Sequence, residues 1–528
     1  MTSTTETQQA FKQLCERNAK VKPGGADRDW MTLSAYYNDE ARDITIGDLA
    51  TLGVGLKDNT RPLECMMLQR IVNRLATVYA SPPLRWLKRK RRRLAESNSA
   101  HQAMLDVLER AQYDLSWKRI DALATLLRVI GVRFYPSDQK GSVVLRVFEP
   151  FNMMRDPDPS AADQIEADRS FALLLEKCGT EEVWEFWQRT GTKADGSPEW
   201  RCTQVDQKGA PTGDQPFAST DLVSPYDKLP VMLVYDELAM GRAWLTPRSS
   251  RISNQRAVNA IANDLWSLVT HQAHSKSVLK SDNPDSAPTI DGHGGTVNIG
   301  TKEDFNVVTP NPKIAESQNV LDYIAFLWAL GEDHPVNEFS RSTQVLTGAA
   351  LMVTERPLDA RREARVPLAI ETEREAWGKF RCVHNLHVAA RASATWSDQE
   401  LLAEDTQLEV EIAEVSAPQD AKALQDVSLR DVLAGAASII DYIGARDRVN
   451  RAKAIATWER VQEDNKAYPP GQLDQTSAAS SGAANAADAA TSAAPGAGLE
   501  AAAAHTDVAA AAGVSSVVQG VQATKAAA

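Results

Sequence analysis

The strongest constraint on the fold is a pair of amphipathic segments that flank a short region rich in strand and turn signals. Residues 247–275 and 314–330 place apolar side chains at helical spacing. Residues 276–313 between them contain three β-prone runs (KSVLK, TVNIG and FNVVT) and several Asn-Pro, Asp-Gly and Gly-Gly turns. Two helices joined in this way predict a helical hairpin whose tip is a small folded unit.

The apolar residues of this hairpin are the ones expected to pack. They are Val258, Ile261, Leu265 and Leu268 on the first helix, Leu321, Ile324 and Trp328 on the second, and Val297, Ile299, Phe305 and Val307 in the region between. Polar residues keep much of the remaining surface of the first helix hydrophilic, namely Arg248, Arg251, Asn254, Arg256 and Asn263. The apolar stripe fits either packing within one chain or packing between neighbouring copies, and both interpretations stay open.

The N-terminal half combines helices with a β-rich region. Residues 1–45 are polar with early glycine and proline, and a helix is predicted through Met67, Ile71, Leu75 and Val78, stopped by Ser81-Pro82-Pro83. A second helical stretch covers about 97–130 and ends at Gly131. Between 132 and 235, short β-prone runs alternate with turn residues, which favours antiparallel hairpins with Trp184, Phe186 and Trp200 packing across strands. The chain is therefore expected to be α+β.

The C-terminal half is mainly helical. Pro335 and Pro357 interrupt the helical pattern in 332–358, and a long helix is expected over 359–395, kinked or started by Pro367. The segment LEVEIAEV (408–415) alternates as a strand does, and 418–466 is helical again. From Gln472 onward the chain consists mostly of Ala, Ser and Gly, a composition that forms no core.

Charge and cysteine content narrow the class of protein. With 58 Lys and Arg against 70 Asp and Glu, the net charge is −12, which disfavours tight binding of DNA. The five cysteines are scattered without a CxxC pair, as expected for a reducing cytoplasm rather than for a disulfide or zinc framework. No signal peptide is expected, and the longest central apolar run, 320–330, is about half the ~20 residues of a membrane helix.

Motifs for catalysis are weak. Neither GxxxxGK[ST] nor GxSxG occurs, and Gly294 and Gly295 in DGHGG (291–295) fit a turn. Two histidine pairs at i, i+3, His271 with His274 and His384 with His387, place imidazoles on one helix face and could hold a metal, but no HExxH motif accompanies them. The acidic pair Asp156 and Asp158, each followed by proline, is more simply a turn.

The sharpest charge feature is the basic run from Arg85 to Arg93 (RWLKRKRRR). It is either a patch that contacts nucleic acid or an acidic partner, or the solvated face of a helix, and the overall acidity favours the second interpretation.

Several segments in a fixed order resemble the phage portal proteins of the head-tail connector type. They are VNRLATVYASPP (72–83), LPVMLVYDE (229–237), SRISNQRAVN (250–259), GGTVNIGTKEDFNVVTPNPK (294–313) and TGAAL (347–351). The resemblance implies a portal-type fold. Its parts are a wing (1–246), a stem of two long helices (247–275 and 314–331), a small α/β clip (276–313), a tunnel-loop region (332–358), a long helix and wing return strand (359–416), a helical crown (417–471) and an Ala-rich tail (472–528).

The resemblance also implies function, partners and location. Portal proteins form a ring, usually of twelve subunits, at one capsid vertex of the virion, and assemble in the host cytoplasm. Double-stranded DNA passes through the ring transiently during packaging and ejection. Partners are the terminase large subunit, head-completion and adaptor proteins, and the major capsid and scaffolding proteins. Tunnel-loop candidates are Val336, Asn337, Phe339, Ser340 and Arg341. No enzymatic activity, cofactor, metal or membrane partner is expected.

Elementary physics agrees with such a role. A bore lined with acidic or neutral side chains lets a polyanion slide, whereas a wall of Lys and Arg would hold it. Repeated heterologous contacts close a ring, so that apolar stripes on the stem helices could be buried by neighbouring copies. Two alternatives remain: a metal-dependent hydrolase that uses His271, His274 and nearby acids, and a capsid or scaffold component without a channel.

Overall fold

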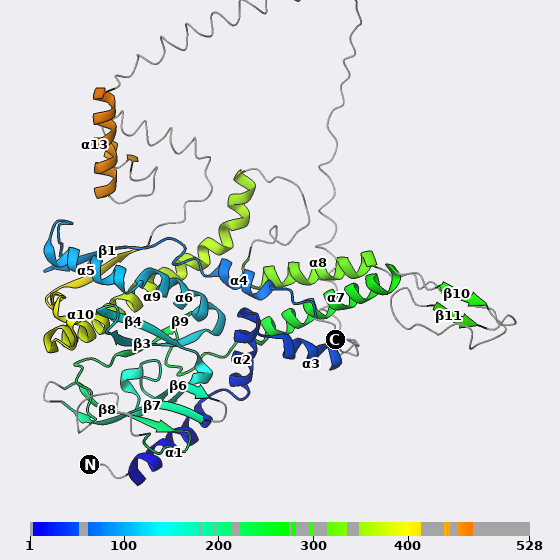
Figure 1. The fold of residues 1–528 in the computed structure, drawn as a ribbon, viewed down its shortest axis with the longest axis horizontal. Coiled ribbons are helices and arrows are strands. Elements are labelled where there is room, and N and C mark those ends of the chain that lie inside the picture. Colours follow the sequence, from blue (N-terminus) through cyan, green and yellow to red (C-terminus); the bar gives the residue numbers. More distant parts are fainter. Residues whose placement is uncertain are drawn as a thin grey trace, which may run out of the picture. The chain divides into compact units, whose positions relative to one another are not determined.

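The computed structural model contains two compact units, Met1–Gln419 and Asp420–Ala528. Helices and mainly antiparallel strands are mixed in the first unit, in agreement with the predicted α+β class (Figure 1). The structure describes residues 4–51, 62–178, 181–193, 196–212, 222–273, 277–280, 296–299, 314–334, 348–412, 438–440, 442–443 and 451–467.

Three helices occupy the N-terminal region, where no individual element was predicted from the polar sequence of residues 1–45. They are α1 (Thr4–Val21), α2 (Ala26–Tyr37) and α3 (Arg42–Thr51). Each has apolar residues for burial: Phe11 of α1 packs on a sheet, and Trp30 of α2 is fully buried in the main core. Gly25 adopts a left-handed conformation before α2 (φ 77°), which glycine accepts without steric cost.

Helix α4 (Met67–Leu75) confirms the first predicted helix, although it ends six residues before Ser81. Its apolar face is buried through Ile71 and Leu75, and Val78 continues that face after the helix has ended. The proline pair therefore follows the end of the helix at some distance and does not itself stop it.

The second predicted helix is in fact two helices, α5 (Ser99–Arg110) and α6 (Tyr113–Leu127). They are separated where Gln112 adopts a left-handed conformation (φ 52°), and Arg128 (φ 71°) ends α6 in the same way. The prediction that Gly131 ends the helix is wrong, because Gly131 lies inside strand β3.

The β-rich region forms two antiparallel sheets, as its hairpin pattern predicted. Their strand orders are β4-β3-β9 and β5-β6-β7-β8. The strands are β3 (Val129–Ser137), β4 (Ser142–Phe148), β5 (Met153–Asp156), β6 (Ser170–Cys178), β7 (Glu181–Thr192), β8 (Pro198–Asp206) and β9 (Val231–Tyr235).

The three aromatic residues expected to pack across strands lie on opposite faces of the four-stranded sheet. Trp184 and Phe186 face α1, where the Phe186 ring meets Phe11 edge-on with centroids 5.5 Å apart. Trp200 faces the main core and meets Phe171 at 5.4 Å. The sheet is thus covered on both faces, which explains why its strands are richer in apolar residues than a one-sided sheet requires.

The basic run forms a β-hairpin, so the helix predicted for it is wrong, whereas the solvent exposure expected of it is confirmed for residues 89–93. Strand β1 (Leu84–Arg89) and the short β2 (Arg92–Arg93) pair across a two-residue turn, and β12 (Gln407–Glu411) pairs with the other edge of β1. Strand β12 confirms the strand predicted in LEVEIAEV and supplies carboxylates to the basic hairpin from more than 300 residues away.

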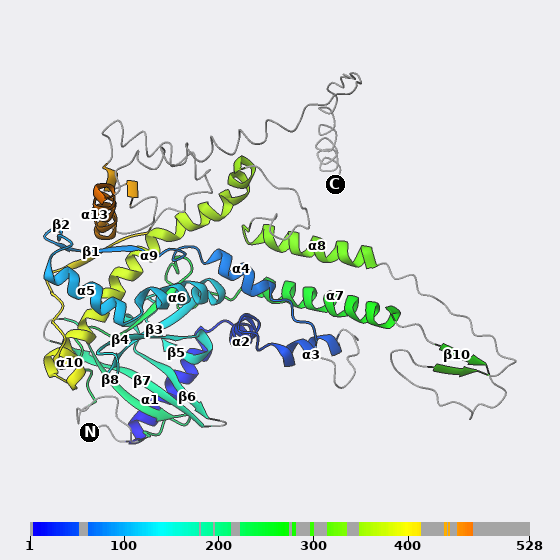
Figure 2. The same cartoon turned by 45° about the horizontal axis from the view of Figure 1, so that its top comes forward.

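The predicted helical hairpin is present. Helix α7 (Ser249–Ala273) and helix α8 (Ile314–Gly331) lie side by side in both views, and the short parallel strands β10 (Ser277–Lys280) and β11 (Thr296–Ile299) lie in the connection between them (Figures 1 and 2). These strands confirm two of the three predicted runs, and FNVVT lies outside the described residues.

Helix α9 (Gly348–Ala390) is longer than predicted and bends along its length (Figure 1). Its expected start at 359 is wrong, because helix begins at Gly348 and both Pro357 and Pro367 lie inside it. A short helix, α10 (Ala394–Ser397), follows and leads to β12. Residues 348–358 of the expected tunnel-loop region are therefore helical.

In the second unit, helix α13 (Arg451–Ala467) confirms part of the helical pattern predicted over 418–466. The Ala-rich tail lies outside the described residues. None of the helices in the described part of the chain is both long and apolar enough to cross a membrane.

Candidate functional site

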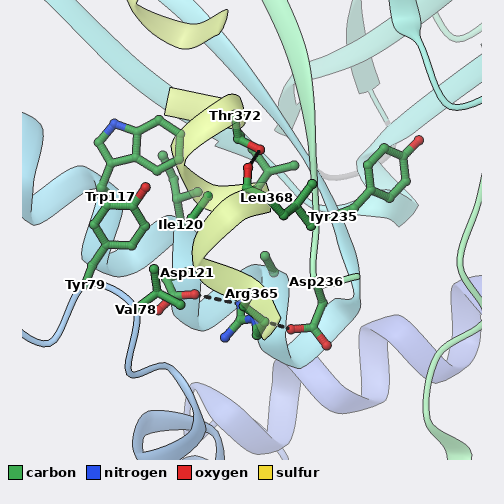
Figure 3. A pocket seen from close by; sticks show the side chains of 13 residues that line it. Val78, Tyr79, Trp117, Ile120, Asp121, Tyr235, Asp236, Arg365, Leu368 and Thr372 are labelled. Atoms are coloured by element: carbon green, nitrogen blue, oxygen red, sulfur yellow. Dashed lines mark hydrogen bonds and ion pairs between the residues drawn. The ribbon is translucent and has the colours of Figure 1, made fainter. Parts of the chain in front are cut away.

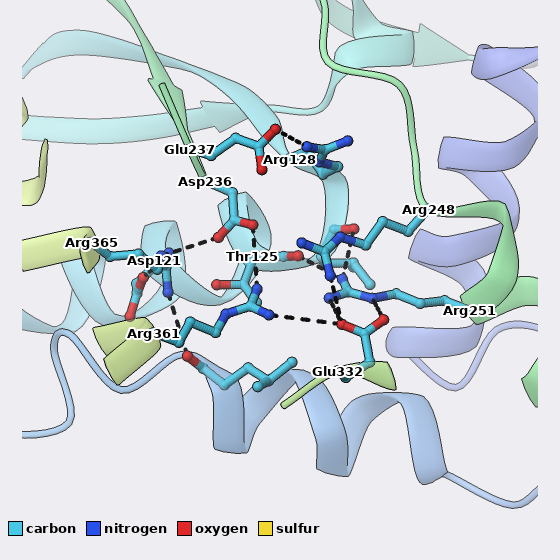
Figure 4. A network of polar contacts seen from close by, with 12 residues as sticks. Asp121, Thr125, Arg128, Asp236, Glu237, Arg248, Arg251, Glu332, Arg361 and Arg365 are labelled. Atoms are coloured by element: carbon cyan, nitrogen blue, oxygen red, sulfur yellow. Dashed lines mark hydrogen bonds and ion pairs between the residues drawn. The ribbon is translucent and has the colours of Figure 1, made fainter. Parts of the chain in front are cut away.

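The base of the helical hairpin is fixed by a buried ion pair between its two helices (Figure 4). Arg251 in the first turn of α7 is fully buried, and its Nε and Nη2 donate to Glu332, which follows α8, at 2.8 and 2.7 Å. Its Nη1 donates to the carbonyl oxygen of Thr125 on α6 at 2.6 Å. Arg251 thus joins both hairpin helices to the core.

The Glu332 carboxylate also accepts a hydrogen bond from Arg248 Nη1 at 2.9 Å. Burial by itself would raise the pKa of Glu332, but the guanidinium groups around it, Arg251 foremost, outweigh burial and lower that pKa below its ordinary value. The carboxylate is therefore charged at neutral pH and holds the guanidinium groups together.

The same network continues to helix α9. Arg365 donates to Asp121 of α6 at 2.7 Å and lies 3.1 Å from Asp236, which directly follows β9. Arg361 lies 3.5 Å from Asp236 and 3.9 Å from Glu332 (Figure 4). Charged groups from α6, α7, α8, α9 and the end of β9 therefore meet at one place, where the hairpin leaves the core.

A small cavity adjoins this network (Figure 3). It encloses about 30 Å³ between Tyr79, Trp117, Asp121, Asp236 and Arg365. Burial raises the pKa of Asp121 although Arg365 opposes it. A cavity of this size holds a water molecule rather than a substrate, because one water needs roughly 10–15 Å³ measured in this way. The site is a structural junction and offers no room for a reaction.

A larger open groove of about 610 Å³ lies between α6 and β4. Its described lining includes Arg119, Tyr135 and Arg146, but it contains no carboxylate, histidine or cysteine. The groove therefore presents no acid and base pair of the kind that general acid-base catalysis uses.

A stripe of buried polar side chains on α7 binds the chain that leads into α4 and the start of that helix. Gln255, Asn259 and Asn263 are nearly fully buried and recur at every fourth residue after Arg251. Their side-chain oxygens accept the backbone N–H groups of Leu68, Cys65 and Leu63 at 2.9, 3.0 and 2.7 Å, respectively.

We call this set of contacts the amide clamp. Asn263 also donates to the carbonyl oxygen of Leu63 at 2.8 Å, and Gln255 donates to that of Cys65. The prediction that the polar residues of α7 are hydrophilic surface is wrong for Arg251 and Asn263, because each is buried and hydrogen-bonded to backbone groups.

The apolar residues predicted as a stem interface lie mostly inside the chain. Val258 and Trp328 are buried in the main core, against which Leu321 and Ile324 also pack. Ile261 and Leu265 are half-buried, and the side chain of Leu268 is outside the described part. The structure thus favours the interpretation in which this stripe joins α7 to α8 within one subunit.

A different face of α8 is apolar and exposed, and we call it the outer stripe. Every exposed residue between 320 and 330 is apolar or aromatic: Val320, Tyr323, Phe326, Leu327 and Leu330. Tyr323 and Leu330 are 61% and 60% exposed. These residues were not predicted as a surface, although VLDYIAFLWAL contains a signal for them: one buried face cannot take up all of its apolar side chains.

The remaining predicted residues have the following places. Val297 and Ile299 lie on β11, whereas Phe305 and Val307 are outside the described residues. Other predicted residues also lie outside the described residues, namely the tunnel-loop candidates Val336, Asn337, Phe339, Ser340 and Arg341, the DGHGG segment and His274.

The histidine pair on α9 already has protein partners. His384 is buried, its Nε2 lies 3.2 Å from the carbonyl oxygen of Glu400, and burial lowers its pKa to about 4. His387 Nε2 lies 3.1 Å from the hydroxyl of Tyr226. Among the described residues no three His, Cys, Asp or Glu side chains converge as metal ligands would.

The turn predicted for the acidic pair is confirmed at Asp158 and is wrong for Asp156, which lies in strand β5. Asp158 accepts from the backbone N–H and the hydroxyl of Ser160 at 2.9 and 2.8 Å, whereas Asp156 ends β5 and pairs with Arg17 of α1 at 2.5 Å.

Comparisons with known proteins leave the family open. No protein-family model matches the sequence, and no curated protein matches it significantly.

Proposed function

We propose that this chain is a phage portal protein, a structural subunit of a ring at one capsid vertex. The ring would conduct double-stranded DNA during packaging and ejection and would dock the terminase large subunit and the head-tail connector proteins. The proposal has two sources. One is the ordered resemblance of five segments to portal proteins, and the other is a helical hairpin whose outer surface is suited to assembly.

The observation that carries the proposal is the outer stripe of α8. A soluble monomer rarely exposes several large apolar side chains side by side, and such patches usually mark an interface. In the outer stripe five of them recur on one helix face, from Val320 to Leu330. The buried Arg251–Glu332 pair holds this helix against α7, so the stripe is presented on a fixed support.

Ring formation gives this stripe a partner. In a cyclic assembly each contact is heterologous, so the stripe of one copy meets a different surface of the next. Helix α7 offers such a surface, because Trp266 is 53% exposed and aromatic side chains are enriched where protein interfaces are strongest. Repeated contacts of this kind form a closed ring when the rotations between neighbouring copies add up to a full turn. Twelve copies is the number usual in portal rings.

Charge is compatible with a conduit for DNA. The chain carries a net charge of −12, and most cations of the basic hairpin are paired with carboxylates of its own fold. Electrostatic attraction to phosphate is the main source of tight nonspecific binding, so an acidic subunit keeps contacts with a moving duplex weak.

Further parts of the proposal come from the resemblance alone. The connection between α7 and α8 would be the clip that meets the terminase and the adaptor proteins, and the 332–347 segment would carry the tunnel loop. Capsid and scaffolding proteins would contact the other side of the ring, in the virion and in the host cytoplasm during assembly.

A charge placed on the outer stripe tests the proposal. Leu327→Asp would put a carboxylate in a contact that excludes water, and Ala315→Asp would put the same charge on an exposed position three turns earlier in α8. We expect Leu327→Asp to abolish rings and Ala315→Asp to leave them intact, as read by mass photometry and negative-stain electron microscopy. Rings of unchanged mass from both variants would contradict the proposal.

A further inference from the structure

The β1–β2 hairpin carries an unusual concentration of positive charge on an acidic protein. Seven of the nine residues from Arg85 to Arg93 are cations. Four of them have partners: the buried Arg85 pairs with Glu373 and Asp114, Lys88 and Arg93 pair with Glu409 of β12, and Arg89 pairs with Asp405.

The tip of the hairpin is different. The side chains of Lys90, Arg91 and Arg92 are exposed, and they form no hydrogen bond or ion pair with the part of the chain that the structure describes. The carboxylates of β12 therefore stop short of the tip, and three adjacent cations remain on a support that ion pairs hold in place.

The local structure is not optimised for stability. Lys90 and Arg91 both have positive φ (48° and 68°), in a two-residue turn where Asn-Gly is the favoured pair because side chains with a Cβ resist this conformation. Arg92 stands directly opposite Arg89, and Arg93 opposite Lys88, so cations face cations across the hairpin. Like charges in opposed positions destabilise a strand pair. Such unfavourable backbone conformations cluster at functional sites.

We infer that the hairpin tip, Lys90, Arg91 and Arg92, contacts the phosphate backbone of duplex DNA. Arginine forks match phosphate oxygens, and a convex cationic tip needs no pocket to reach them. An acidic protein surface fits less well, because the strongest protein contacts use buried aromatic or apolar anchors. None of the tip residues is apolar, and the nearby Trp86 ring is covered by the Arg93 guanidinium at 4.2 Å.

This inference deepens the proposed function, because that function brings duplex DNA to the protein. It adds a contact outside the bore-lining elements that the resemblance implies. Three cations per subunit are enough to guide or retain DNA weakly, and they are too few for tight binding by a single subunit.

Fluorescence anisotropy with a 12-base-pair duplex of arbitrary sequence tests the inference on the full-length chain. Such a duplex is about 40 Å long, so it engages few hairpins at once. If three phosphates are contacted, affinity should fall about 40-fold between 50 and 200 mM monovalent salt. Absence of binding by the wild-type chain at 50 mM salt would overturn the inference.

A matched pair of variants separates the tip from general charge. The tip variant is Lys90→Asn, Arg91→Gly and Arg92→Gln, whose first two changes install the favoured turn residues and so protect the fold. The control replaces Lys12, Lys20 and Lys208, all exposed, by Gln and removes the same charge elsewhere. We expect affinity at 50 mM salt to drop about tenfold or more for the tip variant and to stay within about twofold for the control.

Two further results would contradict the inference. Equal binding by the tip variant and the wild-type chain would overturn the inference. Polyglutamate that displaces the duplex at equal charge concentration would also overturn it, in favour of an acidic protein partner. Mass photometry of the same samples reports ring assembly separately, so loss of the proposed function would be seen as absent rings whatever the duplex does.

Discussion

Arg251 and Glu332 form a two-point ion pair inside the protein, with Nε to Oε1 at 2.8 Å and Nη2 to Oε2 at 2.7 Å, and they join the start of helix α7 to the end of helix α8. The two residues are 81 positions apart in the sequence. Their pairing fixes the angle at which the helical hairpin leaves the core, and with it the direction in which the outer stripe faces.

Removal of the charge on Glu332 should therefore be costly. Glu332→Gln leaves the fully buried Arg251 without a carboxylate, and breaking one side of a buried ion pair typically costs about 3–5 kcal/mol. We expect a clear drop in the thermal unfolding midpoint of the variant. Arg93→Gln, which removes one partner of an exposed ion pair, serves as the control and should cost no more than about 1 kcal/mol. Equal midpoints for the two variants would show that the network does not support the fold.

Loss of the amide clamp should loosen the chain before α4 without unfolding the core. Asn263→Ala leaves both the N–H and the C=O of Leu63 without their partner, a change worth about 1–3 kcal/mol for the local structure. We expect faster hydrogen exchange at residues 62–68 in the variant. Asn254→Ala, on another face of α7, should leave this exchange unchanged. Slow exchange in both variants would mean that other contacts hold the segment.

Stability should depend on pH through His384. Burial lowers its folded pKa to about 4 from an ordinary 6.5, so the unfolded chain takes up a proton at this site before the folded chain does. The stabilising contribution is complete above pH 6.5 and is lost as the pH falls toward 4, by up to about 3 kcal/mol.

The corresponding measurement is the unfolding midpoint of the wild-type chain and of His384→Gln between pH 7 and pH 4. We expect the variant to lose less stability over this interval, because Gln has no proton to bind. Parallel curves for the two proteins would show that His384 does not titrate as its burial requires.

Local periodicity was sufficient to predict the helical hairpin and most of the β-rich region. Helices α7 and α8 lie close to their predicted bounds, because each presents apolar residues at helical spacing to the core. Strand β12 was also predicted, since its alternation of apolar and acidic residues is visible in a short window.

Long-range contacts explain most of the errors. The basic run was expected to be a helix face, and its pairing with β12 depends on carboxylates more than 300 positions away. Helix α9 continues through two prolines, where ion pairs of Arg361 and Arg365 with Asp236 hold its backbone against the core. Such tertiary contacts override the local tendency of proline to end a helix.

The candidate site was only partly predictable for a related reason. A polar stripe such as Gln255, Asn259 and Asn263 has the spacing of a solvated helix face, and only the structure shows that it binds the backbone of residues 63–68. The outer stripe was overlooked because the sequence does not say which of several apolar faces of α8 is buried. The ion pair between Glu332 and Arg251 at the base of the hairpin determines which face of α8 is buried.

The mass and rotational symmetry of the purified full-length particle test the central claim most directly. If neighbouring copies cover the outer stripe in a closed ring, electron microscopy will show annular particles with a central hole. Twelve copies of the 57.6 kDa chain would have a mass of about 690 kDa. A single species of 57.6 kDa that persists across protein concentration and salt, without annular particles, would contradict the account.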